Sequence, residues 1–208
     1  MNNNRKDDHI MFAKAVDVCE NDFDYIRFVH HSIPSISLKD VDLSTTFLGH
    51  KFKYPFYINA MTGGNKKGND INIKLAALAL HFGLPFFVGS QSLAFENKEA
   101  KVSFEKLRIN FPDLFIVANI NPNFTPEMAV AAVKMLRANA LAIHVNSVHE
   151  LVMEEGDRDF TKWEANIRNI LKAVKVPVLI KEVGYGMSEP TLLLLKDIGV
   201  KYIDVSGK

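Results

Sequence analysis

Residues 141–160 read LAIHVNSVHELVMEEGDRDF, and this stretch decides the fold. It opens with apolar and β-branched residues, which is typical of a buried strand. It continues with a dense polar run of His144, Asn146, His149, Glu150, Glu154, Glu155, Asp157 and Arg158. In α/β barrels the active site is built at the carboxyl ends of the strands, so the stretch predicts a strand and its site loop. An ordinary strand with a solvated acidic loop would give the same spacing, and these residues alone leave that alternative open.

A strand followed by a helix recurs on both sides of this stretch. We expect strands to begin near residues 56, 85, 114, 140, 177 and 201, and helices at 69–82, 97–110, from 126, at 163–174 and at 188–198. The strands recur about every 29 residues, close to the roughly 31 residues of one unit in an eight-fold barrel. Continuous apolar strands between helices indicate a parallel sheet that is buried on both faces. The sequence therefore predicts an α/β fold, a (β/α)8 TIM barrel of which about six βα units are present.

An open, doubly wound sheet would share this alternation of strands and helices. Two features favour the barrel: polar residues recur at the end of every strand, and no GxGxxG motif follows the first strand. We expect residues 1–54 to form an N-terminal helix over 11–31 and a capping segment, and residues 55–208 to form barrel units one to six. Six units would leave two open sheet edges, which proteins avoid. We therefore expect the chain to be incomplete at its C-terminus, with the remaining units missing.

Composition narrows the class of partner. The 208 residues are 48% hydrophobic, and 25 basic against 24 acidic residues give a net charge of +1. This balance argues against a general nucleic-acid or membrane-surface binder. The single cysteine, Cys19, excludes an intrachain disulfide, and no apolar run has the length of a secretory signal core or a membrane span. We expect a cytoplasmic protein with no nucleic-acid or membrane partner.

Small or polar residues stand at the end of every predicted strand, namely Met61, Thr62, Ser90, Asn119, His144, Lys181 and Ser206. Lys181 is notable because a lysine inside an apolar strand is rare unless it is paired or functional. An ion pair with Glu182 or Asp204 is the structural alternative. Amides, hydroxyls and a lysine around one pocket suit the hydrogen-bonding edges of a flavin ring.

Eight motifs stand in one register along the chain: RKxxH at 5–9, AMTGG at 60–64, GSQ at 89–91, AN at 118–119, HxNxxxE at 144–150, EGDRxF at 155–160, KEVGxG at 181–186 and DVSG at 204–207. Together they resemble the type 2 isopentenyl-diphosphate isomerases, the flavin-dependent isomerases of isoprenoid synthesis. The resemblance implies a barrel that binds FMN and Mg²⁺. It also implies interconversion of isopentenyl and dimethylallyl diphosphate with reduced flavin, for which NADPH supplies the reduction.

The resemblance assigns roles to particular residues. It implies that the diphosphate substrate contacts Arg5, Lys6, His9, Ser92, His144, Asn146 and His149. It implies that FMN contacts Ala60, Met61, Thr62, Ser90, Asn119, Lys181 and Ser206, and that Glu150 binds Mg²⁺. His149 is our candidate catalytic residue, although the family usually has glutamine there; Glu154 and Ser92 replace the usual proline and basic residue. We also expect a homo-oligomer.

Two other readings of the motifs remain open. Another FMN-dependent barrel, such as a hydroxy-acid oxidoreductase, would share the fold, but RKxxH and HxNxxxE weigh against it. A catalytically dead remnant, kept as a binding or assembly subunit, is supported by His149 and by the missing end. Bound FMN would favour either enzyme over the remnant.

Overall fold

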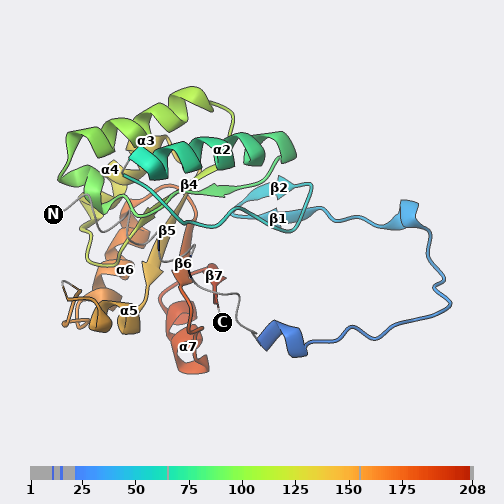
Figure 1. Cartoon of the computed structure of the whole chain (residues 1–208). Helices are drawn as coiled ribbons and strands as arrows, with labels where there is room; N and C mark the ends of the chain where they lie inside the picture. Colours follow the sequence, from blue (N-terminus) through green and yellow to red (C-terminus); the bar gives the residue numbers. More distant parts are fainter. Residues whose placement is uncertain (1–10, 12–14, 16–21, 65, 155, 207–208) are drawn as a thin grey trace.

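A five-stranded parallel sheet forms the centre of the molecule, seen in a computed structural model that describes residues 11, 15, 22–64, 66–154 and 156–206. The strands follow one another in sequence order (Figure 1): β3 (Phe86–Phe87), β4 (Ile116–Ile120), β5 (Ala140–Val145), β6 (Val178–Glu182) and β7 (Tyr202–Asp204). All neighbouring pairs are parallel. Each strand therefore lies beside the next strand along the chain.

The first predicted strand joins this sheet through a single bridge. Ile58 pairs in parallel with Phe86. The Ile58 amide donates to the Pro85 carbonyl at 3.0 Å, and the Ile58 carbonyl accepts from the Phe87 amide at 2.9 Å. Six sheet positions thus run in sequence order. A doubly wound sheet reverses its order at a switch point; because the described strands show no reversal, the predicted barrel class is confirmed as a partial barrel.

Five helices connect the strands and cover one face of the sheet (Figure 1). They are α2 (Lys66–Phe82), α3 (Lys98–Asn110), α4 (Pro126–Leu136), α6 (Trp163–Ala173) and α7 (Glu189–Asp197). Three of these starts were predictable because Asn97, Thr125 and Ser188 accept hydrogen bonds from first-turn amides of α3, α4 and α7. Such caps satisfy donors that a helix cannot satisfy internally.

The two faces of the sheet bury different sets of residues. Ile116, Ala118 and Ile120 of β4 belong to the large core shared with the helices. Val117, between them, belongs to a smaller inner cluster with Phe87, Leu48, Ala140, Ala142 and Leu179. Because side chains alternate along a strand, odd and even positions of β4 face opposite sides. The inner face is the one that a barrel encloses.

A short hairpin closes the amino end of this inner face. It consists of β1 (Thr45–Phe47) and β2 (His50–Phe52), paired antiparallel. The Phe47 ring stacks on Tyr57 at 5.7 Å and meets Tyr202 edge-on at 5.8 Å, and Phe52 meets Phe115 at 5.0 Å. This packing agrees with a capping role for the hairpin. The domain boundary at residue 54 stays a prediction.

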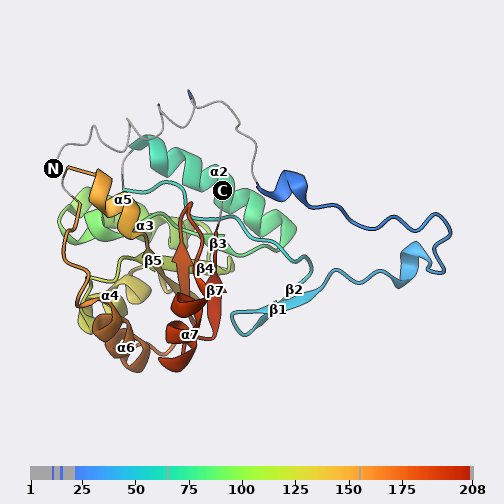
Figure 2. The ribbon, with the colours of Figure 1, turned by 90° about the horizontal axis from the view of Figure 1, so that it is seen from below.

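The predicted helix over 11–31 is wrong where the structure describes it beyond residue 25. Met11 and Ala15 are helical, a short 3-10 helix, η1 (Asp22–Tyr25), follows, and residues 26–31 have no regular secondary structure. Residues 22–43 run away from the barrel as an arm (Figure 2), interrupted by a second 3-10 turn, η2 (Leu38–Asp40). Phe28 is 96% exposed and Ile33 is 91% exposed. A helix gains most of its stability by packing an apolar face, and the apolar side chains of Phe28 and Ile33 remain exposed.

Candidate functional site

A polar layer lies at the carboxyl end of the inner face. Asn119, His144, Lys181 and Asp204 each stand two residues beyond an apolar inner residue: Val117, Ala142, Leu179 and Tyr202. Side-chain alternation therefore directs them to the same face. His144 is in register with Lys181, and Lys181 is in register with Asp204. Adjacent strands thus hold an imidazole, an amine and a carboxylate in one row.

Lys181 is buried in this layer, with 3% of its surface exposed. Burial lowers the pKa of its amine, while the negative charges of Asp204 and Glu182 oppose that shift. Glu182 Oε2 accepts the amides of Tyr185 and Gly186 at 2.8 and 2.9 Å, so it is committed to the following loop. Asp204 is therefore the carboxylate that shares the inner face with Lys181.

Asp204 links the two ends of the sheet. The Tyr57 hydroxyl donates to Asp204 Oδ2 at 2.6 Å, and Asn59 Nδ2 lies 3.4 Å from the same oxygen. Burial, and then the Asp204 carboxylate, raise the pKa of Tyr57. Sequence reasoning missed Tyr57 and Asn59. The polar pair at alternate positions in PFYINA is the signal that could have placed them on the inner face.

Asn119 and His144 form a hydrogen-bonded pair. Asn119 Oδ1 lies 3.0 Å from His144 Nδ1, and Asn119 Nδ2 donates to the Val88 carbonyl at 3.0 Å. Desolvation lowers the pKa of His144 to about 4, helped by the charges of Lys181 and His149 and opposed by the Ile120 carbonyl. His144 is therefore neutral at pH 7.

Close backbone contacts shape the ends of the first two strand positions. The Gly89 amide donates to the Thr62 carbonyl at 3.0 Å, and a Cβ on Gly89 would lie 2.2 Å from that oxygen. Only glycine fits there. Thr62 Oγ1 lies 2.9 Å from Asn72 Oδ1 on α2, and Ser90 Oγ lies 3.0 Å from Ser92 Oγ. Small residues and amides thus line this rim, beside Ala60 and the exposed Met61.

The polar run that we expected to be a long loop contains a helix, α5 (Ser147–Val152). Asn146 caps it, since its Oδ1 accepts the His149 amide at 2.8 Å. Gly156 then folds back on the helix: a Cβ there would lie 2.0 Å from the Glu150 carbonyl oxygen. The Asp157 amide donates to Glu150 Oε2 at 3.0 Å. The HxNxxxE and EGDRxF motifs therefore form one unit that orients the Glu150 carboxylate.

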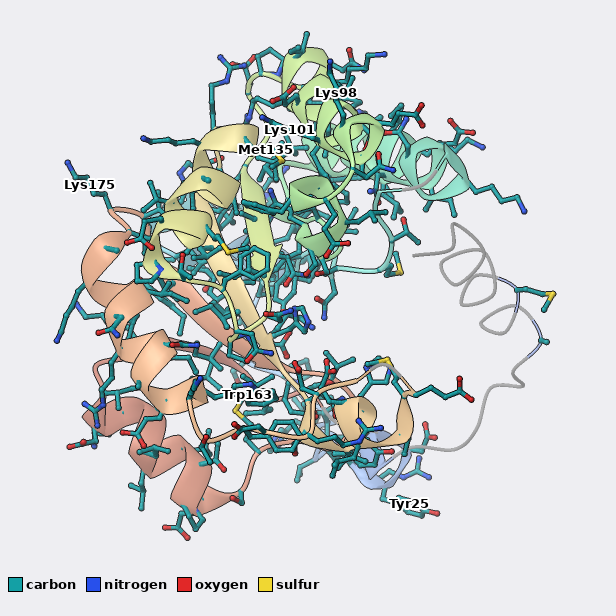
Figure 3. The ribbon with its side chains drawn as sticks, turned by 90° about the vertical axis from the view of Figure 1, so that its left-hand side faces the viewer. Tyr25, Lys98, Lys101, Met135, Trp163 and Lys175 are labelled. Carbon is teal, nitrogen blue, oxygen red and sulfur yellow. The ribbon has the colours of Figure 1, made fainter. Side chains whose placement is uncertain are left out.

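Arg158 fastens this unit. Its guanidinium donates to the Glu150 carbonyl, to the Gly156 carbonyl at 2.8 Å and to the Met153 carbonyl at 2.6 Å. Trp163, labelled in Figure 3, donates from Nε1 to Asn123 Oδ1 at 2.9 Å at the loop's far end. We did not assign Arg158 a structural role from the sequence, because the motif showed its charge but not its backbone partners.

The predicted site residues fall into four groups, and one of them is the rim described above, with Ala60, Met61, Thr62, Ser90 and Ser92. Asn119, His144 and Lys181 meet in the polar layer, joined by Asp204. Asn146, His149 and Glu150 belong to α5 and its cap, and Ser206 follows β7; Ser206 Oγ accepts the Gly184 amide at 3.0 Å. Arg5, Lys6 and His9 lie outside the described residues. Within the described ranges no three His, Cys, Asp or Glu side chains, Glu150 included, converge as a metal site.

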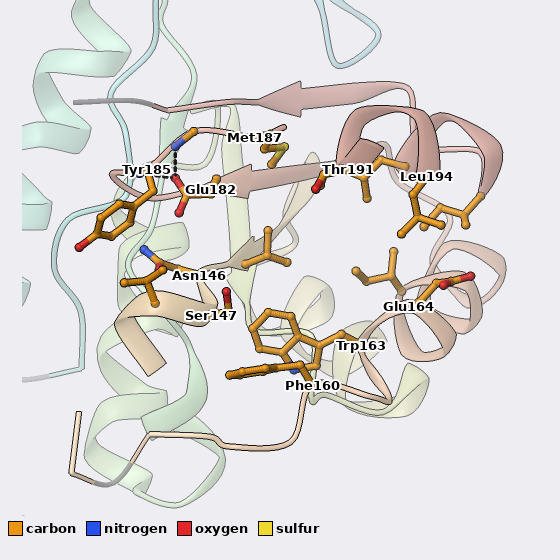
Figure 4. A pocket seen from close by; sticks show the side chains of 16 residues that line it. Asn146, Ser147, Phe160, Trp163, Glu164, Glu182, Tyr185, Met187, Thr191 and Leu194 are labelled. Carbon is orange, nitrogen blue, oxygen red and sulfur yellow. Dashed lines mark hydrogen bonds between the residues drawn. The ribbon is translucent and has the colours of Figure 1, made fainter. Parts of the chain in front are cut away.

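A separate cavity of about 450 Å³ lies between α5, α6 and α7 (Figure 4). Phe160 and Trp163 form part of its wall, with ring centroids 4.7 Å apart. Val145 and Glu182 also line it, and they alternate with His144 and Lys181 along their strands. The cavity is therefore on the helix-covered side of the sheet and is not the polar layer.

Sequential parallel strands with a polar layer at their carboxyl ends define the chain as a large part of an α/β barrel with its site at one rim. The family model described as FMN-dependent dehydrogenase matches residues 13–102. Mandelate oxidase resembles 82% of this chain with a TM-score of 0.53 and 13% identity, over 55% of its own chain. A variant of that oxidase gives a TM-score of 0.56 at 13% identity, over 82% of this chain and 53% of its own. These structures support the fold alone.

Sequence comparison identifies nearer relatives. Proteins named isopentenyl-diphosphate delta-isomerase from Staphylococcus aureus strains JH9 and Newman are 48% identical over 205 residues, which is 98% of this chain. The chain is thus a relative of the isopentenyl-diphosphate delta-isomerases, and the resemblance found in its motifs is confirmed. The match spans 59% of the length of those relatives. Within the described residues, no helix combines the length and apolarity needed to cross a membrane.

Proposed function

We propose that the protein is an FMN-dependent isomerase that interconverts isopentenyl diphosphate and dimethylallyl diphosphate. The observation that carries this proposal is the 48% identity to proteins named as that isomerase, over 98% of the chain. The buried Lys181 in a polar layer at the barrel rim supports it, because a flavin site needs hydrogen-bonding groups and a positive charge there. The reaction moves a double bond by adding one proton and removing another, so it is redox-neutral.

The substrate's diphosphate calls for cations and hydrogen-bond donors. Arg5 and Lys6 would hold its oxygens through charge-assisted hydrogen bonds. The wall of the substrate site would be completed by His9, Ser92, His144, Asn146 and His149. His149 would be the catalytic residue, with its imidazole placed where glutamine would offer an amide. His144, neutral and hydrogen-bonded to Asn119, would keep one ring nitrogen for contact with the substrate.

FMN fits the groups that surround the rim. Ala60, Met61, Thr62, Ser90, Asn119, Lys181 and Ser206 would hold it. Bound FMN in its reduced form would supply the acid–base group for the proton transfers. Lys181 would stabilise negative charge on the ring, since a buried cation acts strongly in a medium of low dielectric constant. NADPH would serve as the reductant that brings FMN to this form.

Magnesium would bind through Glu150 and the substrate diphosphate together. Mg²⁺ prefers hard oxygen ligands, keeps several waters and is commonly held by one or two carboxylates plus phosphate. The amide of Asp157 holds Glu150 Oε2 at 3.0 Å, which fixes the carboxylate before the ion arrives. A single protein carboxylate is compatible with weak binding of Mg²⁺ that strengthens when the substrate is present. We further propose a cytoplasmic homo-oligomer.

The test is turnover of isopentenyl diphosphate by the protein under anaerobic conditions with FMN, NADPH and Mg²⁺. We expect dimethylallyl diphosphate to accumulate while NADPH is consumed only once per FMN. Omission of Mg²⁺ should abolish the conversion. A protein that binds FMN but leaves isopentenyl diphosphate unchanged would contradict the proposal. Proton exchange into recovered substrate, followed by NMR, would detect even a slow reaction.

A second candidate is an FMN-dependent oxidoreductase, and the matched dehydrogenase model over residues 13–102 favours it. Such an enzyme would oxidise a 2-hydroxy acid and transfer its hydride to oxidised FMN. Bleaching of the flavin absorbance by a panel of 2-hydroxy acids would identify it. Isomerisation without net flavin reduction would identify the first candidate. The oxidoreductase would reduce the flavin and the isomerase would not, so the two assays separate the two functions.

A further inference from the structure

The amide of Asn119 can be oriented from its surroundings. Its Nδ2 donates to the Val88 carbonyl at 3.0 Å, and its Oδ1 lies 3.0 Å from His144 Nδ1. The reverse orientation would place the amide oxygen against a carbonyl oxygen, with no hydrogen between them. A carbonyl accepts and cannot donate, so Val88 selects one orientation of the amide. Asn119 Oδ1 therefore faces His144.

Gln91 holds the backbone of Asn119 through two hydrogen bonds. Gln91 is fully buried, and its Oε1 accepts the Asn119 amide at 3.1 Å. The backbone amide of Gln91 donates to the Asn119 carbonyl at 2.9 Å, and the side-chain Nε2 of Gln91 donates to the Ala132 carbonyl of α4 at 3.1 Å. Both backbone groups of Asn119 are thus tied to the buried Gln91, the amide through its side chain and the carbonyl through its backbone. The position of Asn119 Oδ1 is fixed by the fold, independently of any ligand.

An acceptor at Nδ1 determines which ring nitrogen of His144 carries its proton. A neutral imidazole has one N–H and one bare nitrogen, and the hydrogen bond at one nitrogen decides which is which. Two acceptors face the imidazole, Asn119 Oδ1 and the Ile120 carbonyl. The contact of Asn119 Oδ1 is with Nδ1, and because this oxygen can only accept, Nδ1 must donate. The bare nitrogen is then Nε2, and this is the atom that can accept a hydrogen bond or a proton.

We propose that Asn119 is a positioning residue that holds neutral His144 in its Nδ1–H tautomer and leaves Nε2 as the acceptor. The role in turnover rests on the proposed function, in which His144 lines the substrate pocket. The tautomer itself does not, because the hydrogen bonds that set it are present in the chain without ligands. A hydrogen-bond donor or a proton would meet Nε2, whereas an anionic oxygen of the diphosphate would not.

Nitrogen-15 NMR of the protein labelled at histidine tests the tautomer directly. The chain has seven histidines, and the signal that is lost in His144→Gln belongs to His144. At pH 7, without FMN or substrate, we expect a protonated Nδ1 and a bare Nε2. A protonated Nε2 in the wild type would overturn the proposal, whatever the activity of the protein.

Two substitutions at Asn119 separate positioning from a structural role. Asn119→Leu removes the acceptor, and we expect His144 to shift to a mixture with Nε2–H. Asn119→Asp keeps an acceptor, so Nδ1–H should persist, and the new carboxylate should raise the pKa of His144 against the charges of Lys181 and His149. Asn121→Leu is the matched control, since Asn121 accepts from Asn123 rather than from His144. Its spectrum should match the wild type.

Activity gives an independent second reading. If the protein isomerises isopentenyl diphosphate, Asn119→Leu should lower kcat per bound FMN by about tenfold or more, because a misoriented hydrogen-bonding group in the pocket wall disturbs the placement of the substrate. An unchanged kcat, with an altered tautomer, would overturn the catalytic part of the proposal. An inactive wild type with the expected tautomer would instead refute the proposed function and leave the positioning intact. Should Asn119→Leu fail to fold, the wild-type and Asn119→Asp spectra still decide.

Discussion

Tyr57 donates a hydrogen bond of 2.6 Å to Asp204 across 147 residues of sequence. Tyr57 lies beside the first sheet position and Asp204 ends the last strand, so the bond ties the two ends of the sheet through its inner face. The aromatic ring rests on Phe87 at 4.5 Å and on Phe47 at 5.7 Å. The partial barrel is therefore held by a polar contact at its rim and by aromatic packing beneath it.

Removal of this bond should destabilise the chain. In Tyr57→Phe, the carboxylate of Asp204 loses a donor, and a hydrogen bond to a charged group contributes about 1.5–3 kcal/mol. We expect a loss of about 2 kcal/mol or less in the free energy of unfolding, measured by urea denaturation, because Asp204 is partly exposed. Tyr54→Phe is the control, since that ring stacks on Phe56 away from the layer. Equal stability of both variants would rule out a contribution from the bond.

Lys181 should affect both the affinity for FMN and the reduction potential of the bound flavin. In Lys181→Met, loss of a buried positive charge should weaken FMN binding and lower the reduction potential of the flavin, because negative charge on the reduced ring is no longer balanced. Lys175→Met is a matched control at an exposed lysine that projects into solvent (Figure 3). Fluorescence titration and spectroelectrochemistry measure the two quantities. If neither changes, Lys181 is a structural partner of Asp204.

The lowered pKa of His144 makes stability depend on pH. Its folded value is about 4, whereas the unfolded value is about 6.5. Between these values the unfolded chain takes up the proton and the folded chain does not, so stability is complete above about pH 6.5 and falls towards pH 4. The midpoint of urea unfolding should fall more steeply over this window in the wild type than in His144→Gln. The exposed His81 provides the control variant His81→Gln, which should follow the wild type.

Arg158 should control the mobility of the Glu150 unit. Arg158→Ala removes donors to the carbonyls of Glu150, Gly156 and Met153, so amides of residues 149–157 should exchange with solvent faster. Arg168→Ala removes only exposed ion pairs with Glu164 and Asp197, which are typically worth about 0–1 kcal/mol. Hydrogen exchange read by mass spectrometry compares the two. Similar exchange in both variants would show that the unit holds without Arg158.

His149 should tolerate glutamine. In both residues a nitrogen lies at a similar distance from the backbone, so His149→Gln should retain isomerase activity, measured as dimethylallyl diphosphate formed. If the wild type is inactive and the glutamine variant is active, the dead-remnant reading gains support. If both are inactive while FMN is bound, His149 is not what limits turnover. An inactive glutamine variant of an active protein would show a specific requirement for the imidazole.

The barrel units were predictable because each signal was local. Caps at Asn97, Thr125 and Ser188 mark helix starts, and apolar runs such as that of β5 mark buried strands. The polar layer was predictable in part, since Asn119 and Lys181 interrupt apolar strands. The order of the strands was enough to predict that the side chains of Asn119 and Lys181 lie on one inner face.

Long-range partners were not predictable in the same way. The bond from Tyr57 to Asp204 depends on how far the sheet curves, which no local pattern encodes. The helix α5 was missed because its six residues lie inside a polar run, and its cap Asn146 was read only as a substrate contact. Residues 26–31 of the arm were misread as helical because periodic apolar residues need a surface to pack against, and Phe28 is 96% exposed.

The sequential order of the strands has a consequence for synthesis on the ribosome. Each strand from β4 onward pairs with the strand made just before it, so its partner is already outside the exit tunnel when it emerges. Chains fold from the N-terminus as they are translated. During synthesis, the unpaired edge on the growing side of the sheet therefore belongs to the strand that was made last. The contact of Tyr57 with Asp204 can form only after the last of these strands has been delivered.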